Sequence, residues 1–507
     1  MKLYLFLFTL LFMFACKKEP SKTDYLGVVN IMVSGKEQAL PHFEKGLLLL
    51  HSFEYSDARE AFIKAQEVDP KMAMAYWGEA MTYNHSLWSE QDYEDAVLVL
   101  QRLDSIDIND ISELEKDFIQ SSRLLYKAKT PKVERDKLYS EYMEKLYKKY
   151  PDNHEVAAFY ALSLLGSVPE GRDEVIYGQG AKIAQGILDK NPNHPGALHY
   201  LIHSYDDPGH AQLALDAANS YSKVAPDASH ALHMPSHIYS ALGMWDEVVS
   251  SNIASYQASL NRMERKKLGN DDRGYHAFHW LEYGYLQKGN FDEAKKMVLD
   301  MQKYTNETPS VRARVHLIFL KGSYLVDTND WDSDIADIPV DISDLNIAIK
   351  SQYNFLEGMK AFKKRDKVLL DSIISNMQND YDEQSLLVSL DGVKVCASVS
   401  RGDVTQTNID ESQIMQMQLK ALRAWLENDE VAAEDWLKKS TALQDSMSFS
   451  YGPPFIQKPS HELYADWLVA HNRFDEAIEH YDLTLKRAKN RRLTLESKEK
   501  LLVENKV

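Results

Sequence analysis

Residues 39–72 read ALPHFEKGLLLLHSFEYSDAREAFIKAQEVDPKM, and this stretch decides the fold class of the chain. With Ala39 counted as position 1, three small residues occupy positions 8, 20 and 27, namely Gly46, Ala58 and Ala65. Phe62 stands at position 24 and Pro70 at position 32. Small side chains let two helices approach closely, a bulky ring fills the space between them, and proline ends the second helix. The stretch therefore predicts two packed helices joined by a turn.

The same positions resemble the signature of the tetratricopeptide repeat, a helix–turn–helix unit of 34 residues. Proline, glycine and alanine frame further copies at 195–228, 229–262, 275–308 and 458–491, and less regular copies lie near 71–104, 351–384 and 414–447. No segment of the sequence alternates apolar and polar residues over a sustained length, so almost no strand is expected. The predicted fold class is all-α, a tetratricopeptide superhelix, or α-solenoid.

The N-terminus has the composition of a targeting segment. Lys2 precedes an almost unbroken apolar run from Leu3 to Phe14, which is too short to span a bilayer but suits a signal peptide. Ala15 directly before Cys16 resembles a bacterial lipobox. By that resemblance, residues 1–15 are a lipoprotein signal peptide, Cys16 is lipidated, and residues 16–38 are a lipid-anchored linker. The implied location is the cell envelope, at the outer membrane. A plain secretory signal with an incidental cysteine is the alternative.

The remaining sequence suggests two superhelical halves. Residues 39–326 are expected to form the first and residues 345–507 the second, with an aspartate-rich loop at 327–344 between them. Alternating aspartates within this loop are similar to a calcium-binding loop, but Ile335 stands where that loop needs glycine. We therefore expect a solvated acidic turn. Residues 449–458, SYGPPFIQKP, form a second break before the last repeat.

The charge and the cysteine count exclude some classes of protein. The net charge of -18 argues against binding to nucleic acid and against direct attraction to an anionic membrane surface, so membrane attachment would come through the lipid. If Cys16 carries lipid, Cys396 is the only other thiol, and no intramolecular disulfide can form. Stability must then come from packing.

Seven histidines within the repeats are expected to face one way. Their spacings of three and four residues are those of one helix face. In the repeat frames they fall at positions 2, 5 and 9 of first helices. By resemblance to other tetratricopeptide superhelices these positions, together with 12 and 13, line the concave groove. The predicted groove residues are His199, His203, Asp206, Asp207, His230, His233, His237, His276 and His279.

Three kinds of chemistry fit a histidine-lined groove. Imidazoles from neighbouring helices can meet over one transition-metal ion such as zinc, copper, nickel or iron. The candidate ligands for a divalent transition metal are His199, His203, His233, His237 and His279. Protonated histidines could instead bind an anionic ligand, either an acidic peptide or a charged glycan. A polar network that only stabilises the fold, or a general peptide groove, is the third alternative.

The histidine block also carries a family resemblance. Residues 194–249, with 275–289 and 458–468, resemble a family of large bacterial tetratricopeptide proteins, similar to lipoproteins of Bacteroidota. That resemblance covers most of the mature chain and implies the fold and the groove but no activity. Lipoproteins of this kind are sometimes encoded among polysaccharide-utilisation genes, which makes an accessory role in glycan uptake an alternative function.

The sequence favours a binding protein over an enzyme. It contains no H-E-x-x-H zinc motif, no G-x-S-x-G elbow and no Walker A loop. The leading hypothesis is a lipid-anchored envelope scaffold that binds a protein or peptide partner in its groove. The first alternative is a metal-binding protein or metalloenzyme that uses the histidines.

Overall fold

A computed structural model describes residues 25–389 and 403–504 of the chain. It confirms the all-α tetratricopeptide superhelix: helices follow one another as antiparallel hairpins, in the frames that proline, glycine and alanine predict. The only strands among the described residues are β1 (Asn84–His85) and β2 (Glu90–Gln91), which pair antiparallel in one short ladder. No helix within 25–389 or 403–504 has the length and apolarity that a membrane span requires.

The helices of the first half pair in sequence order. They are α1 (Leu40–His51), α2 (Tyr55–Val68), α3 (Ala73–Met81), α4 (Tyr93–Leu103), α5 (Glu113–Leu125), α6 (Lys132–Lys149), α7 (His154–Gly166), α8 (Glu174–Leu188), α9 (Pro195–Tyr205), α10 (Leu215–Val224), α11 (Ser229–His233) and α12 (Pro235–Leu242). Pro235 separates α11 from α12, because its ring nitrogen has no hydrogen to donate to the preceding turn.

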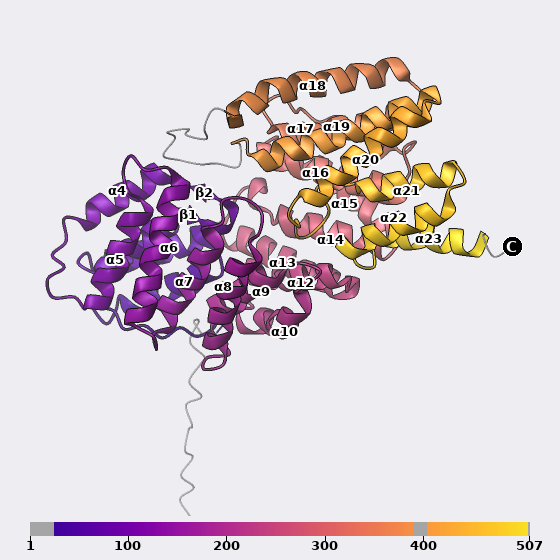
Figure 1. The fold of residues 1–507 in the computed structure, drawn as a ribbon. Helices are drawn as coiled ribbons and strands as arrows, with labels where there is room; N and C mark the ends of the chain where they lie inside the picture. Colours follow the sequence, from indigo (N-terminus) through magenta and orange to yellow (C-terminus); the bar gives the residue numbers. More distant parts are fainter. Residues whose placement is uncertain (1–24, 390–402, 505–507) are drawn as a thin grey trace, which may run out of the picture.

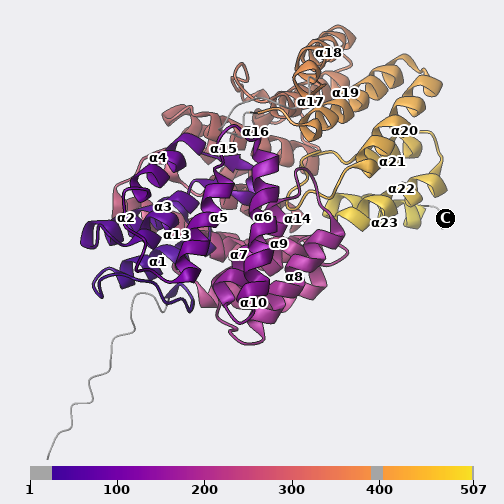
Figure 2. The ribbon, with the colours of Figure 1, turned by 60° about the vertical axis from the view of Figure 1, so that its left-hand side comes forward.

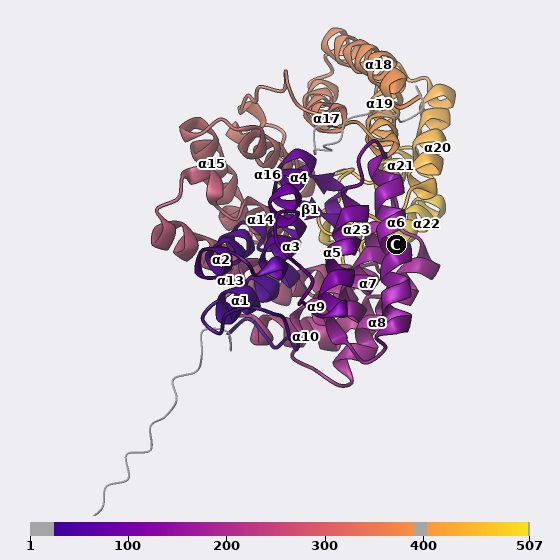
Figure 3. The same cartoon turned by 90° about the vertical axis from the view of Figure 1, so that its left-hand side faces the viewer.

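The second half continues the same pattern with longer helices. They are α13 (Trp245–Lys266), α14 (Tyr275–Gln287), α15 (Phe291–Glu307), α16 (Val311–Thr328), α17 (Ile347–Lys363), α18 (Lys367–Ser389), α19 (Gln406–Glu427), α20 (Glu430–Ser446), α21 (Ser460–Ala470), α22 (Phe474–Arg487) and α23 (Arg492–Glu504). Figure 1 shows α4–α10 in a first lobe and α17–α23 in a second lobe, and Figure 2 shows the same two groups of helices from another side. Figure 3 shows α15–α22 following one another around an arc.

The contact that defines the first repeat is present as the sequence predicts. Phe62 of α2 is fully buried against α1 and α3. A Cβ atom added to Gly46 would lie 2.7 Å from Cε1 of Phe62, closer than side chains tolerate. Glycine at position 8 is therefore required for α1 and α2 to pack at this distance.

The boundary between the two cores differs from the predicted one. One continuous apolar core runs from Leu26 to Val248, and a second runs from Val249 to Leu501. The division therefore falls inside α13, some eighty residues before the predicted acidic loop. An interior helix can belong to both cores because its two ends pack on different neighbours, and no local sequence pattern marks such a point.

The acidic segment 327–344 is also less solvated than predicted. Asp327 belongs to α16 and is buried, while Trp331 and Ile335 are buried in the second core. Other aspartates of the segment pair with cations on neighbouring helices, as in the contact of Arg314 Nη1 with Asp344 Oδ1 at 2.6 Å. The loop is thus anchored by its apolar residues and by ion pairs.

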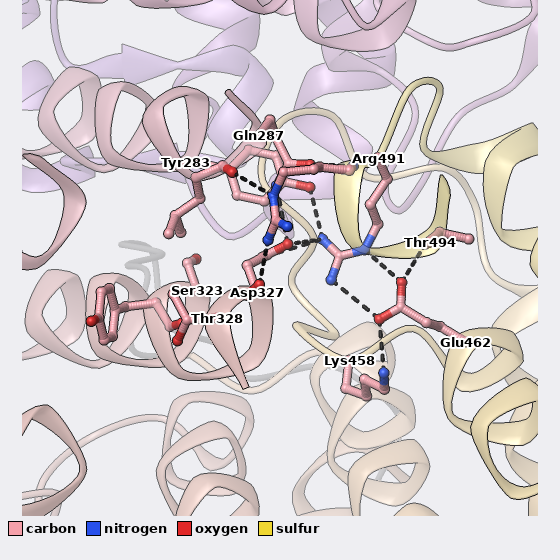
Figure 4. Close-up of polar contacts among 12 residues, drawn as sticks. Tyr283, Gln287, Ser323, Asp327, Thr328, Lys458, Glu462, Arg491 and Thr494 are labelled. Carbon is pink, nitrogen blue, oxygen red and sulfur yellow. Dashed lines mark hydrogen bonds and ion pairs between the residues drawn. The ribbon is translucent and has the colours of Figure 1, made fainter. Parts of the chain in front are cut away.

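Asp327 takes part in a buried ion cluster that closes the second half (Figure 4). Arg491, which is completely buried, contacts Asp327 of α16 at 3.1 Å and Glu462 of α21 at 2.8 Å. Lys458 contacts the other oxygen of Glu462 at 2.9 Å, and Tyr283 of α14 accepts a hydrogen bond from Arg491. The cluster joins α14 and α16 to the start of the last repeats.

Part of the predicted linker belongs to the folded domain. Leu26 is buried, and the backbone N–H of Val28 donates to the carbonyl of Asn193 at 2.9 Å. Further along, Ser34 donates from its N–H and its hydroxyl to Glu115. Residues 25–38 therefore pack along the first lobe, because they carry the apolar and hydrogen-bonding groups that a free linker lacks. Cys16 and the predicted signal peptide lie outside the described residues.

Candidate functional site

Six of the seven predicted histidines meet in one continuous cluster. Helix α9 supplies His199 and His203, the α11–α12 segment supplies His230, His233 and His237, and α14 supplies His276. Ligand nitrogens of His199, His203 and His230 all lie within 4.8 Å of one another, and we call these three residues the first trio. Those of His233, His237 and His276 meet the same limit and form the second trio.

The cluster is closed rather than open to a groove. His199 is fully buried, His203 is 5% exposed, and His233 and His237 are 2% exposed. His230 is half-buried, and His276 is exposed at the rim. The histidines lie on the first helices of their repeats, as predicted. Their rings, however, face one another between these helices instead of lining a free surface.

Asp206 holds one ring from each trio. Its Oδ2 atom accepts a hydrogen bond from Nδ1 of His203 and another from Nδ1 of His237, each at 3.1 Å. Its other oxygen contacts Arg172 at 2.6 Å. Because a carboxylate can only accept from these rings when it is ionised, both imidazoles carry their hydrogen on Nδ1. This is the arrangement by which carboxylates orient metal-binding histidines.

Two further rings are fixed in the same way. Nδ1 of His233 donates to Oδ1 of Asn252 at 2.7 Å, and Asn252 is itself oriented by donating to the carbonyl of Val248. Nδ1 of His199 donates to the backbone carbonyl of His51 at 2.8 Å. Four imidazoles therefore have hydrogen on Nδ1 and a lone pair on Nε2.

In the second trio two of these lone pairs face each other. Nε2 of His233 lies 3.2 Å from Nε2 of His237. With both Nδ1 atoms already donating, neither Nε2 carries a hydrogen that could bridge the gap. Two acceptors at this distance repel unless a cation lies between them.

In the first trio two ring nitrogens are unsatisfied. Nε2 of His199 and Nε2 of His230 are both buried and have no hydrogen-bond partner within the described part of the chain. Buried polar atoms are normally hydrogen-bonded, so such atoms call for a specific explanation, such as an ion.

The environment keeps three of these rings neutral. Burial, followed by the neighbouring imidazoles, holds the pKa of His199, His230 and His233 well below the ordinary histidine value. Burial would raise the pKa of Asp206, but the hydrogen bonds from His203 and His237 outweigh it and hold that pKa below its ordinary range. A neutral imidazole is the form that binds a metal ion.

Aromatic side chains cover the cluster. The ring of Phe53 lies 4.2 Å from that of His199, and Trp280 stacks on His237 at 4.6 Å. Residues 447–459, between α20 and α21, form a segment that we call the cover loop. Its Tyr451 places a ring 4.7 Å from His237. The cover loop comes from the second half, so the site is complete only when both halves pack together.

A polar cavity of about 410 Å³ adjoins the cluster between the two halves. Its lining includes His203, Asp206 and Arg172, together with Glu411 of α19 and residues of the cover loop. Burial raises the pKa of Glu411 to about 8, so this carboxyl is neutral at pH 7. The cavity reaches the edge of the histidine cluster at His203 and Asp206.

A second buried group supports the first trio. His51 of α1 contacts Glu155 of α7 at 2.7 Å and Tyr200 of α9 at 2.8 Å, and His194 contacts the other oxygen of Glu155 at 3.2 Å. Burial opposes ionisation of Glu155, but the two histidines overcome it and lower its pKa. These polar atoms satisfy one another, so the group positions α1, whose His51 carbonyl holds His199.

Several predicted residues lie apart from the trios. Nε2 of His279 lies 3.5 Å from Oγ of Ser323, and its ring stacks on Phe319. Asp207 contacts Arg172 and His210 at the outer side. His279 falls outside because the α14 helix turns it toward α16. The sequence did not indicate Arg172, Asn252, Phe53 or Tyr451, whose contacts with the histidines are long-range and leave no local pattern.

The comparisons with known proteins add little beyond the fold. No family model matches the sequence, and no curated protein matches it. Yeast Tom70 matches with 13% identity over 93% of this chain and 90% of its own, with a TM-score of 0.33. The human IFIT1 dimer with m7Gppp-AAAA matches with 12% identity over 94% and 83%, with a TM-score of 0.35. These TM-scores are too low to support a conclusion about function.

Proposed function

We propose that this protein binds a transition-metal ion through the second trio. The observation that carries the proposal is the 3.2 Å separation between Nε2 of His233 and Nε2 of His237. Two nitrogens bound to one ion at ~2.05 Å in tetrahedral geometry lie about 3.3 Å apart. The two rings are therefore already spaced as ligands of a single ion, and their Nδ1 atoms are held by Asp206 and Asn252.

His276 supplies the third ligand. It lies at the rim, with its ring 4.6 Å from that of His233. Three imidazoles leave a coordination position free, which is typical of metal sites that exchange a bound molecule. Imidazole suits zinc, copper, nickel and iron, so the donor set favours this group of metals over magnesium or calcium.

Metal content tests the proposal. The full chain is purified without a histidine tag, stripped with a chelator and reloaded, and its metal is measured by elemental analysis. Wild type is expected to retain at least one equivalent, and the double variant His233→Gln/His237→Gln is expected to lose the ion held by the second trio. His279→Gln is the matched control, since it removes an imidazole from the same helix as His276 but outside the trio. Metal retained equally in all three proteins would refute the site.

The interaction scaffold expected from the sequence is a second proposal. It is supported by the superhelix, which presents long surfaces on which partners of repeat proteins bind. The His233→Gln/His237→Gln variant separates the two ideas, because a broad partner surface would keep most of its affinity. Affinity capture from the native envelope, compared between this variant and wild type, measures the difference.

Anchoring in the outer membrane is a further proposal, and it rests on the Ala15–Cys16 pattern alone. The variant Cys16→Ala should move the protein from the membrane fraction to the soluble fraction of the envelope. Unchanged fractionation would contradict lipidation at Cys16. An accessory role in polysaccharide uptake would show as impaired growth on complex glycans after deletion of the gene.

A further inference from the structure

The first trio supports an inference that rests on the proposed function and extends it. We propose that His199, His203 and His230 hold a second metal ion beside the first, so that the two trios form a paired copper(I) centre. Each trio offers three imidazole nitrogens within 4.8 Å of one another. The second trio alone would account for one ion, and the first trio has its own reasons to hold another.

The first reason is the pair of unsatisfied nitrogens. His199 is fully buried, its Nδ1 donates to the carbonyl of His51, and its Nε2 has no partner among residues 25–389 and 403–504. Nε2 of His230 is also buried and has no hydrogen-bond partner among these residues. A buried polar nitrogen without a partner carries a desolvation penalty. An ion bound by both nitrogens would remove that penalty twice.

The second reason is that the trios are neighbours. The rings of His203 and His237, one from each trio, lie 5.2 Å apart, and those of His230 and His233 lie 5.9 Å apart. Within the first trio the rings of His199 and His203 lie 4.9 Å apart. The spacing between trios is therefore close to that within a trio. One oxygen of Asp206 accepts hydrogen bonds from both His203 and His237, so it holds the two trios next to each other.

Charge favours copper(I) over a divalent ion. The six imidazoles are neutral ligands, and Asp206, the carboxylate that contacts these rings among the described residues, is already paired with Arg172. Two divalent ions would bring four positive charges into a cluster covered by Phe53, Trp280 and Tyr451. Two copper(I) ions bring half as many. Buried charge without a counter-charge is strongly unfavourable, and imidazole is a suitable ligand for copper.

Anaerobic titration of the full chain tests the paired centre. Wild type is expected to bind two equivalents of copper(I) but only one of zinc(II). His230→Gln should bind one equivalent of copper(I), His233→Gln/His237→Gln should also bind one, and the control His279→Gln should bind two. His230 is used because it is half-buried, so its replacement disturbs packing less than replacement of His199.

The outcomes separate this inference from the proposed function. One copper in wild type that His230→Gln keeps and His233→Gln/His237→Gln loses would refute the second site and leave the first. No bound metal in wild type would refute both. Zinc binding at two equivalents would refute the preference for copper(I). X-ray absorption of the copper-loaded wild type needs no variant: about three nitrogen ligands per copper are expected, and sulfur ligation would overturn the assignment.

Discussion

At the scale of single residues, Asp206 connects the parts of the candidate site. Its carboxylate accepts from His203 and His237 with one oxygen and contacts Arg172 with the other. Arg172 reaches Asp207 as well and donates to the carbonyl of Ser204, so the loop that follows α9 is held in one geometry. A change at Asp206 should therefore disturb ring orientation in both trios at once.

Asp206→Asn is expected to weaken metal binding by about 10–100-fold. The amide keeps one oxygen that can accept, but it has no negative charge with which to hold two imidazoles and a guanidinium. Asp207→Asn is the matched control, because Asp207 contacts Arg172 and His210 but no ring of the trios. Competition with a chelator of known affinity measures the two constants. Equal affinities for the two variants would show that Asp206 does not orient the ligands.

Glu411 should give the protein a pH-dependent stability. Its pKa is raised to about 8 in the folded state because the carboxyl is buried, against an ordinary value of 4.5. The folded state therefore holds a proton that the unfolded state has lost. This contribution is complete below pH 4.5, and it declines as the pH rises to 8, by about 1.4 kcal/mol for each pH unit.

The variant Glu411→Gln should remove this decline, because glutamine is neutral at every pH. The free energy of unfolding is measured by urea denaturation from pH 5 to 8, and the difference between variant and wild type should grow in favour of the variant. Glu434→Gln is the contrasting control. Arg473 lowers the pKa of Glu434 to about 2, so the change of stability with pH that this carboxyl causes is confined to pH values below 4.5. A constant difference for Glu411→Gln would contradict the raised pKa.

At the scale of elements, several turns of the helical hairpins contain a residue with positive φ, and one of these turns lies beside the site. Gly243, Gly289, Asn428 and Asn472 have positive φ between the two helices of their repeats, where glycine and asparagine are favoured. Phe53 occupies the same position between α1 and α2 with φ of 55°. A bulky residue is strained there. Its ring lies against that of His199, so this turn places an aromatic side chain over the imidazoles.

Gly452 positions the cover loop in a similar way. Its φ is 88°, and a Cβ atom there would lie 2.2 Å from Cζ2 of Trp280, which stacks on His237. Gly452→Ala should therefore lift the cover loop, destabilise the fold by about 1–3 kcal/mol and speed the release of metal to a chelator. Stopped-flow chelation and thermal unfolding measure the two effects.

Gly178→Ala is the control for this experiment. Gly178 lies in α8, and an added Cβ there would meet no described atom within 4 Å. Alanine at this open position inside a helix should stabilise the fold by about 0.5–1 kcal/mol and leave metal release unchanged. Release at the wild-type rate from Gly452→Ala would mean that the cover loop does not limit access.

Much of this architecture could be predicted from local patterns. The spacing of Gly46, Ala58 and Phe62 is enough to predict the first hairpin, and spacings of three and four residues put the histidines on inner helix faces. The contacts that give the site its chemistry are different. Tyr451 approaches His237 across more than two hundred residues of sequence, and Asn252 meets His233 from the next helix. Such contacts depend on the packing of whole repeats, so no local spacing indicates them.

At the scale of the whole molecule, the C-terminal repeats return to the first lobe and complete the site. Nζ of Lys489 donates to the carbonyl of Pro208 at 2.6 Å, and the indole of Trp245 donates to the carbonyl of Asn490 at 2.9 Å. Ser448 of the cover loop accepts from the backbone of Arg172. Arg491, which follows Asn490 in the chain, belongs to the buried ion cluster of Figure 4. That cluster holds residues 489–491 through Asp327 and Glu462.

Arg491→Ala is therefore expected to destabilise the protein by about 3–5 kcal/mol, because Asp327 and Glu462 would stay buried without their cation. Arg473→Ala is the control, since it removes two ion pairs at a partly exposed position and should change stability by about 1 kcal/mol or less. Denaturation in guanidinium chloride, with helical content as the signal, compares the two. Equal losses would mean that the buried cluster does not hold the C-terminal repeats in place.

The most direct measurement of the central claim is anomalous X-ray diffraction from crystals of the metal-loaded full chain, recorded on both sides of the absorption edge of the metal. If the second trio binds the metal, an anomalous peak is expected ~2.0–2.1 Å from Nε2 of His233 and from Nε2 of His237. A second peak is predicted among His199, His203 and His230. Loaded crystals with no peak at His233 and His237, or with the metal bound only elsewhere on the chain, would contradict the central claim.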